Sequence, residues 1–121
     1  MSVSDASALL AFVQDEAGAD VVEGALDEGC WCSAANWSEV AQKVLASERD
    51  WGLVRALLLS YELTVEPVEI DDAEWAARRW VRAEGLSLAD RLCLALATRL
   101  GELALTADTT WGTAAPAQQI R

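Results

Sequence analysis

The chain has 121 residues and a mass of 13.0 kDa, the size of one domain, and 53% of its residues are hydrophobic, which excludes a disordered tail. Twenty acidic residues against nine basic ones give a net charge of −11, which argues against binding nucleic acid through a broad basic surface or lying on an anionic membrane. The chain contains no histidine, so Ser-His-Asp and Cys-His catalysis and histidine-bound zinc are excluded.

The hydrophobic pattern predicts short extended runs that alternate with longer helical ones. In chain order we predict a strand over 1–4, helices over 7–17 and 20–28, a strand over 30–33, helices over 37–46 and 51–59, a strand over 64–68, helices over 71–84 and 88–100, a strand over 103–106, and an edge strand ending near Ile120. Gly18, Gly29, Gly85 and Gly101 are interpreted as helix ends. Such alternation implies right-handed crossovers, so we expect an α/β protein: a three-layer α/β/α sandwich with a central, mainly parallel sheet, in one domain spanning 1–121.

The length and the cysteine content predict a core that needs no disulfide bond, with all cysteine thiols reduced. The folded surface should be roughly 6,300 Å². Cys30, Cys32 and Cys93 are expected to be reduced and apolar, with Cys30 and Cys32 on opposite faces of their strand. No apolar run approaches the roughly 20 residues of a membrane span, and Asp5 appears early with no basic region before it, so we expect no signal peptide, no membrane contact and a cytoplasmic location.

Four acidic residues fall where α/β folds gather ligand sites, at the carboxyl ends of the strands. Asp5 directly follows the first strand, and Asp108 follows the fourth with one residue between. Glu39 and Asp90 are predicted in the first turns of helices that begin at the same edge. Four carboxylates held together repel one another unless a cation separates them, and oxygen ligands suit Mg²⁺ or Mn²⁺. Such a cation could polarise a phosphodiester and orient attack by water.

The same acidic positions also suit helix caps. Segments 36–39, 71–74 and 87–90 each resemble a capping box, in which an acid accepts a hydrogen bond from a backbone N–H at the start of a helix. The pattern alone leaves both interpretations, metal ligand and cap, open.

Four segments in chain order resemble the motifs of the PIN domain family, and they cover nearly the whole chain: VSDASALLAF at 3–12, NWSEV at 36–40, LSLADRLCLALA at 86–97 and LALTAD at 103–108. The subgroup they resemble is the VapC-type toxins of bacterial toxin–antitoxin pairs. The resemblance implies a PIN-like domain and a Mg²⁺- or Mn²⁺-dependent endoribonuclease. It implies that the catalytic and metal-binding acids are Asp5, Glu39, Asp90 and Asp108. Ser7 and Thr106 match small hydroxyl positions beside them.

Basic and aromatic residues suggest further contacts. Four arginines, three of them clustered, are candidates to hold RNA phosphates: Arg78, Arg79, Arg82 and Arg91. The alternative is a solvated helix face that balances nearby glutamates. Trp37 and Trp80, at helical spacing, are interpreted as core residues, with stacking platforms for bases as the alternative.

The resemblance also implies a partner, a cognate antitoxin that binds DNA and wraps the toxin with a basic and apolar C-terminal segment. We expect it to seat apolar residues around Trp51, Leu53 and Leu57 and to bring a basic end to the acids. We also expect a homodimer, and the apolar face of Leu53, Leu57 and Tyr61 suits either a dimer contact or the core. Two other functions stay open: a non-catalytic PIN-like binding or regulatory module, and a metal-dependent phosphatase of another α/β family.

Overall fold

The sheet of this protein is entirely parallel. The structure, a computed structural model, describes residues 1–121. The strands, in the order β3-β2-β1-β4-β5, are β1 (Ser2–Ser4), β2 (Cys30–Ser33), β3 (Leu63–Glu66), β4 (Leu103–Thr106) and β5 (Ala117–Gln119). The helices are α1 (Ala6–Val13), α2 (Ala19–Glu28), α3 (Ala34–Ala46), α4 (Trp51–Leu59), α5 (Ile70–Arg78), α6 (Leu88–Leu100) and the short 3₁₀ helix η1 (Thr109–Trp111). The longest, α3 and α6, have 13 residues each, and no helix combines the length and the hydropathy needed to cross a membrane.

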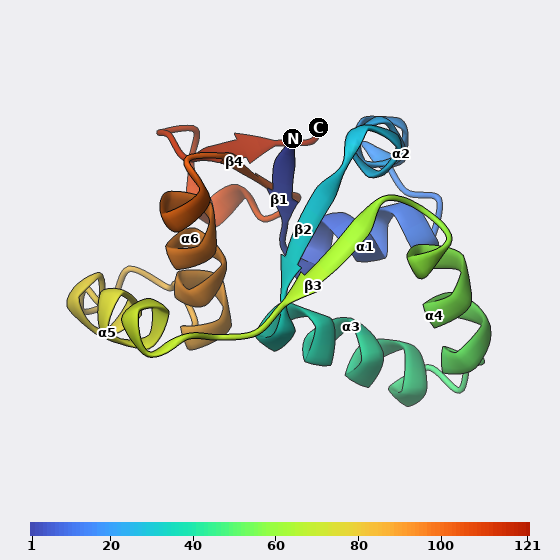
Figure 1. Ribbon diagram of the computed structural model, residues 1–121, viewed down its shortest axis with the longest axis horizontal. Helices are drawn as coiled ribbons and strands as arrows, with labels where there is room; N and C mark the ends of the chain where they lie inside the picture. The colour runs from blue at the N-terminus through green and yellow to red at the C-terminus, as the bar shows by residue number, and fades with distance from the viewer.

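Helices cover both faces of the sheet. Helices α1 to α4 lie on one side and α5 and α6 on the other (Figure 1). A core of 17 buried residues fills the α1–α4 side, and a smaller core of 6 lies between α6 and the sheet. The predicted three-layer α/β/α sandwich is therefore confirmed. The surface of 6405 Å² agrees with the expected value of roughly 6,300 Å².

Strand β1 lies at the centre of the sheet, with β2 on one side and β4 on the other. Its Ser4 is fully buried, and the hydroxyl lies 3.1 Å from the sulfur of Cys30, so this polar residue has a partner inside the sheet. Beyond β1 the pairing continues: the Asp5 N–H donates to the Leu105 carbonyl at 3.0 Å. Because all strands run the same way, the segments that follow β1 and β4 leave the sheet at one edge, side by side.

Helix α1 is shorter than the sequence predicted. It ends at Val13 instead of residue 17, because Asp15 adopts a left-handed conformation (φ 53°) that turns the chain out of the helix. The Glu16 N–H then donates to the Ala11 carbonyl at 2.8 Å, which completes a Schellman-type helix end.

Gly18, predicted to end that helix, instead precedes α2. Its φ is 91°, and a Cβ atom there would lie 2.8 Å from the carbonyl oxygen of Ile120. Only glycine allows the C-terminal segment to approach so closely.

Helix α5 is also shorter than predicted: it ends at Arg78 and not near residue 84. The next residues form a loop in which Ala83 has φ 64°, and Gly85 lies in that loop and ends no helix. Trp80, interpreted as a core residue, lies in the same loop and is 54% exposed, so that interpretation was wrong.

All three cysteines are free and buried, as expected. Cys30 and Cys32 belong to the same core on the α1–α4 side. The expectation that they face opposite sides was wrong, because residues two apart in a strand point to the same face.

Candidate functional site

Asp5 is the most constrained acid of the molecule. It is the N-cap of α1, is 3% exposed, and accepts hydrogen bonds at both carboxylate oxygens. Its Oδ1 accepts from the Ser7 hydroxyl at 2.7 Å and from the Ala8 N–H at 2.8 Å, while its Oδ2 accepts from the Thr106 hydroxyl at 2.6 Å. The two hydroxyls singled out in the sequence therefore both hold this carboxylate in place.

The charge of Asp5 is costly where it lies. Burial raises the pKa of Asp5 to about 6 from 3.8, although the hydrogen bonds from Thr106, Ala8 and Ser7 act in the opposite direction. The negative charge of Asp90 adds to the rise. A positive ion beside these two carboxylates would relieve this electrostatic cost.

Ser7 and Thr106 also connect the ends of β1 and β4. Their hydroxyl oxygens lie 3.2 Å apart, the Ser7 hydroxyl accepts from the Ala107 N–H at 2.9 Å, and the Thr106 hydroxyl accepts from the Asp108 N–H at 3.0 Å. The two segments, 100 residues apart in sequence, are thus fixed in one register.

Glu39 lies in the second turn of α3 and not in the first, because α3 begins at Ala34 with Ser33 as its N-cap. Segment 36–39 is therefore no capping box. Asn36 is fully buried inside the helix, and its amide donates to Glu39 Oε1 at 2.9 Å and to the Ala89 carbonyl at 3.4 Å. Asn36 thus orients Glu39 and ties α3 to α6, a role that the sequence analysis missed.

Asp90 does belong to a capping box. Its Oδ2 accepts from the Ser87 N–H at 2.9 Å, and its own N–H donates to the Ser87 hydroxyl at 3.1 Å. The box expected at 71–74 is instead formed two residues earlier, by Glu69 and Asp72.

Asp108 caps the 3₁₀ helix η1. Its Oδ1 accepts from both the N–H of Thr110, at 2.9 Å, and the hydroxyl of Thr110, at 2.7 Å.

The four acids line one pocket of about 220 Å³, which Ser7 and Ser87 also line. We call it the acidic pocket. One oxygen of each acid outside the core takes part in no hydrogen bond within the protein: Glu39 Oε2, Asp90 Oδ1 and Asp108 Oδ2. Cap and ligand are therefore compatible roles, since one oxygen fixes the side chain and the other has no partner within the protein. The oxygen-only donor set suits Mg²⁺ or Mn²⁺. No three of the acids converge closely enough here to enclose an ion by themselves, so water would complete such a shell.

Lys43 is the one basic residue that lines the acidic pocket, and the sequence analysis missed it. It lies on α3 four residues after Glu39, so the two side chains share one helix face. That spacing was the signal that could have identified it.

The four candidate arginines do not line the acidic pocket. Arg78 pairs with Glu74 at 3.2 Å, and Arg79 pairs with Glu84 through two hydrogen bonds at 2.7 and 3.0 Å. The guanidinium of Arg82 lies 5.9 Å from the ring centre of Trp80.

Arg91, on α6, donates to the carbonyl of Ala76 on α5 at 2.7 Å. Its contact with RNA, like that of the other three, stays a prediction.

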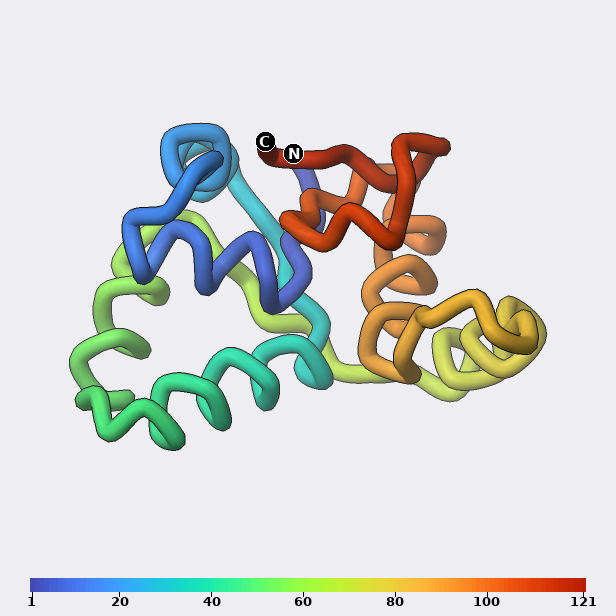
Figure 2. Tube along the Cα trace, turned by 180° about the vertical axis from the view of Figure 1, so that it is seen from behind, coloured from blue at the N-terminus to red at the C-terminus, as the bar shows by residue number.

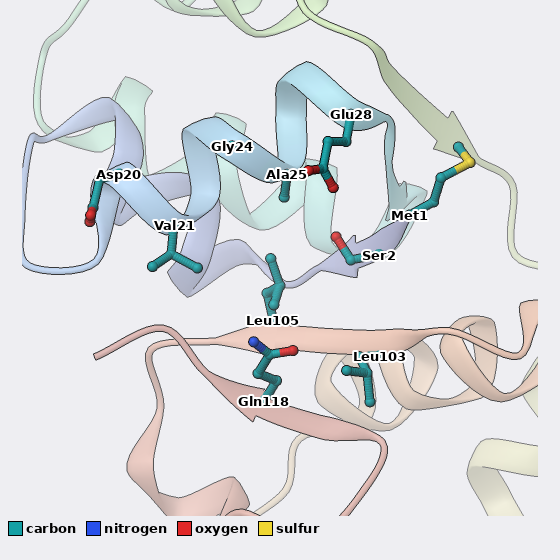
Figure 3. A pocket seen from close by; sticks show the side chains of 10 residues that line it. All are labelled: Met1, Ser2, Asp20, Val21, Gly24, Ala25, Glu28, Leu103, Leu105 and Gln118. Carbon is teal, nitrogen blue, oxygen red and sulfur yellow. The ribbon is translucent and has the colours of Figure 1, made fainter.

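A larger cavity, of about 350 Å³, lies between α2 and strands β1, β4 and β5 (Figure 3). Its two acids, Asp20 and Glu28, are at opposite ends of α2, about 12 Å apart along the helix axis. No set of charged or nucleophilic groups converges there, so the acidic pocket is the better candidate site.

Comparison with known proteins places the chain within a family. The family model of the PIN domain matches residues 3–115. The fold is similar to that of a chain in a toxin–antitoxin complex from Klebsiella pneumoniae, with a TM-score of 0.81 and 19% identity over 100% of this chain and 98% of that one. It is also similar to Mycobacterium tuberculosis VapC20, described as a toxin that cleaves the sarcin–ricin loop, with a TM-score of 0.69 and 19% identity over 86% and 87% of the two chains. A search of curated proteins found no match.

Proposed function

The chain belongs to the PIN domain family, and on that basis we propose that it is a metal-dependent endoribonuclease that acts as the toxin of a toxin–antitoxin pair. The observation that carries the proposal is the acidic pocket: four carboxylates from four separate segments line one cavity beside two hydroxyls. The similarity in fold to VapC20 and to a chain of a toxin–antitoxin complex supports the choice of RNA as substrate and of an antitoxin as partner.

In this mechanism Asp5 and Asp90 would hold Mg²⁺ or Mn²⁺, and Glu39 and Asp108 would contribute directly or through water. Bound there, the cation would neutralise charge on the scissile phosphate and activate water for attack. Thr106 and Ser7 fix the orientation of Asp5, so its carboxylate needs no reorganisation when the substrate binds.

The oxygens of Glu39 and Asp108 that make no hydrogen bond within the protein can accept a proton from the attacking water. Lys43, at the edge of the same pocket, can donate to a phosphate oxygen of the RNA.

The test is cleavage of total RNA by the purified chain with Mn²⁺ and with EDTA, beside a phosphomonoester substrate. We expect cleavage of RNA with metal only and no turnover of the phosphomonoester. Asp90→Asn should abolish cleavage, whereas Glu74→Gln, which changes an exposed acid on α5, should retain it. Activity at the parent level in Asp90→Asn contradicts the catalytic assignment, and turnover of the phosphomonoester alone favours a phosphatase. A chain that cleaves neither substrate is a binding module.

For the antitoxin, the structure offers exposed apolar side chains on α4. Leu53 is 70% exposed and Leu57 is 44% exposed, whereas Trp51 packs edge-on against Trp37 with ring centres 5.2 Å apart. We therefore assign the docking surface to Leu53 and Leu57, with Trp51 as their support. Leu53→Ser with Leu57→Ser should abolish co-purification with a co-expressed antitoxin and leave RNA cleavage intact. Loss of a homodimer instead would assign the face to self-association.

A further inference from the structure

A further cavity, of about 170 Å³, is lined in part by residues next to those of the acidic pocket in the sequence. Its walls come from α5, α6 and the segment that follows β4, which lie together on one side of the molecule (Figure 2). Trp75 and Trp111 provide aromatic walls, and Leu86 and Leu94 provide aliphatic ones. We call it the tryptophan pocket.

The two pockets are lined by neighbouring residues. Asp108 lines the acidic pocket, and Thr110, whose hydroxyl donates to Asp108 at 2.7 Å, lines the tryptophan pocket. Two consecutive residues before α6 also line different pockets: Leu86 lines the tryptophan pocket and Ser87 lines the acidic pocket. We therefore expect a nucleotide whose phosphate lies among the acids to place its adjoining groups near the tryptophan pocket.

The polar groups of the tryptophan pocket are suited to a flat, polar-edged guest. The indole N–H of Trp111 is buried and has no hydrogen-bond partner within the protein, which is unfavourable for a buried donor. Arg79 and Glu84 also line the cavity as a hydrogen-bonded pair. Since Arg79 uses two of its five N–H groups on Glu84, further donors remain, and the carboxylate retains acceptor capacity.

We propose that the tryptophan pocket is a subsite for an unpaired nucleobase adjoining the phosphate that is cleaved. This inference rests on the proposed ribonuclease function and adds to it how sequence or structure in the RNA is selected. Aromatic walls bind the face of a base, and side-chain donors and acceptors read its edge. The Arg79–Glu84 pair supplies that polar edge.

Position favours a base over a side chain of the antitoxin as the occupant. The exposed leucines assigned to the antitoxin lie on α4, whereas the tryptophan pocket is built from α5, α6 and η1, on the other side of the sheet. A base attached to a phosphate in the acidic pocket needs no other anchor to reach it.

The first test uses the unaltered chain with Ca²⁺ in place of Mg²⁺, so that the acids beside the phosphate are neutralised while the larger, more flexibly coordinated ion supports cleavage poorly. The indole N–H signals of the six tryptophans are followed by NMR while single-stranded RNA tetranucleotides are added, with a blunt RNA duplex as the control. We expect the Trp111 and Trp75 signals to shift and the signal of Trp80, in the exposed loop, to stay. A Trp111 signal that does not move at saturating oligonucleotide overturns the proposal.

Variants provide the second test. Trp75→Leu should weaken tetranucleotide binding by about 5-fold to about 150-fold through lost stacking, and Trp75→Phe should retain most of it. Ala114→Phe, at an exposed position on the wall, fills the cavity without removing a core side chain and should weaken binding equally. Trp80→Phe is the matched control and should bind as the parent does.

The outcomes separate this proposal from the ribonuclease proposal. Tetranucleotide binding that depends on Trp75 while no RNA is cleaved would retain the subsite and remove the nuclease. Cleavage with unchanged sequence preference in both Trp75→Leu and Ala114→Phe would overturn the subsite and retain the nuclease. Signal shifts at Trp111 with antitoxin peptide but not with RNA would assign the pocket to the protein partner and overturn the proposal.

Discussion

The buried carboxylate of Asp5 should make the metal-free protein more stable in mild acid than at neutral pH. Burial raises the pKa of Asp5 to about 6 from 3.8. Between these values the folded state keeps a proton that the unfolded state releases, so the free energy of unfolding falls as the pH rises from about 4 to about 6. A difference of about two pKa units corresponds to about 3 kcal/mol, all of which is lost by pH 7.5.

Asp5→Asn removes this charge and keeps the shape of the side chain. An amide has one oxygen, so one of the hydrogen bonds now made at the two carboxylate oxygens is weakened, at a cost of about 1 kcal/mol. We therefore expect the variant to be more stable than its parent by about 2 kcal/mol at pH 7.5 and less stable by about 1 kcal/mol below pH 4. For a chain of this length, the gain at pH 7.5 corresponds to about 8 °C in Tm.

The assay is urea unfolding in EDTA, followed by tryptophan fluorescence at pH 4, 5, 6 and 7.5. Glu74→Gln is the control, because Glu74 is exposed and pairs only with Arg78; its effect should stay below about 0.5 kcal/mol throughout. The assignment of Asp5 as an electrostatically unfavourable buried carboxylate would be refuted by either of two results. One is an Asp5→Asn variant with no higher free energy of unfolding than the parent at pH 7.5, and the other is a difference in this free energy that does not vary with pH.

Three further predictions concern charge and packing. Mn²⁺ at about 100 times its Kd should raise the Tm of the parent by about 10 °C, read by differential scanning fluorimetry; an unchanged curve would remove the shared metal site. Lys43→Gln removes the one basic side chain of the acidic pocket, so it should lower the Tm of the metal-free protein by about 2–4 °C and enlarge the rise in Tm caused by metal. A smaller metal-induced rise in Tm would mean that Lys43 does not compete with the cation. Asp72→Ala should lower the free energy of unfolding in urea by about 2–3 kcal/mol, because Arg99 loses two hydrogen bonds, at 3.0 and 3.2 Å, that join α5 to α6. A decrease of less than about 0.5 kcal/mol would show that this ion pair contributes little to stability.

Helix α6 shows what the sequence predicts well. Its bounds were predicted correctly, because Ser87 and Asp90 form a capping box at the start and Gly101, with φ 68°, ends it. The end of α1 uses the same backbone geometry with Asp15 in place of glycine. Residue type alone does not identify such an end, since aspartate adopts a left-handed conformation only where the surrounding contacts require it.

The placement of the acids followed from topology, whereas their orientation did not. Asp5, Asp90 and Asp108 could be assigned to one edge because parallel strands end there. The contacts that orient Asp5 and Glu39 come from Thr106 and Asn36, and the relevant distances depend on how β4 and α6 pack against the rest of the chain. No local sequence pattern contains that information. The catalytic roles themselves remain predictions.

The acidic pocket joins the two ends of the chain, with a consequence for its synthesis. The hydroxyl that holds Asp5 belongs to Thr106, 101 residues later, and β1 cannot complete its pairing until β4 exists. At ordinary translation rates Thr106 is added about 5 to 20 s after Asp5. A nascent chain on the ribosome therefore carries no assembled pocket until β4 has been added. A product truncated before residue 103 lacks Asp108 as well as the strand that fixes Asp5, so it cannot assemble the acidic pocket.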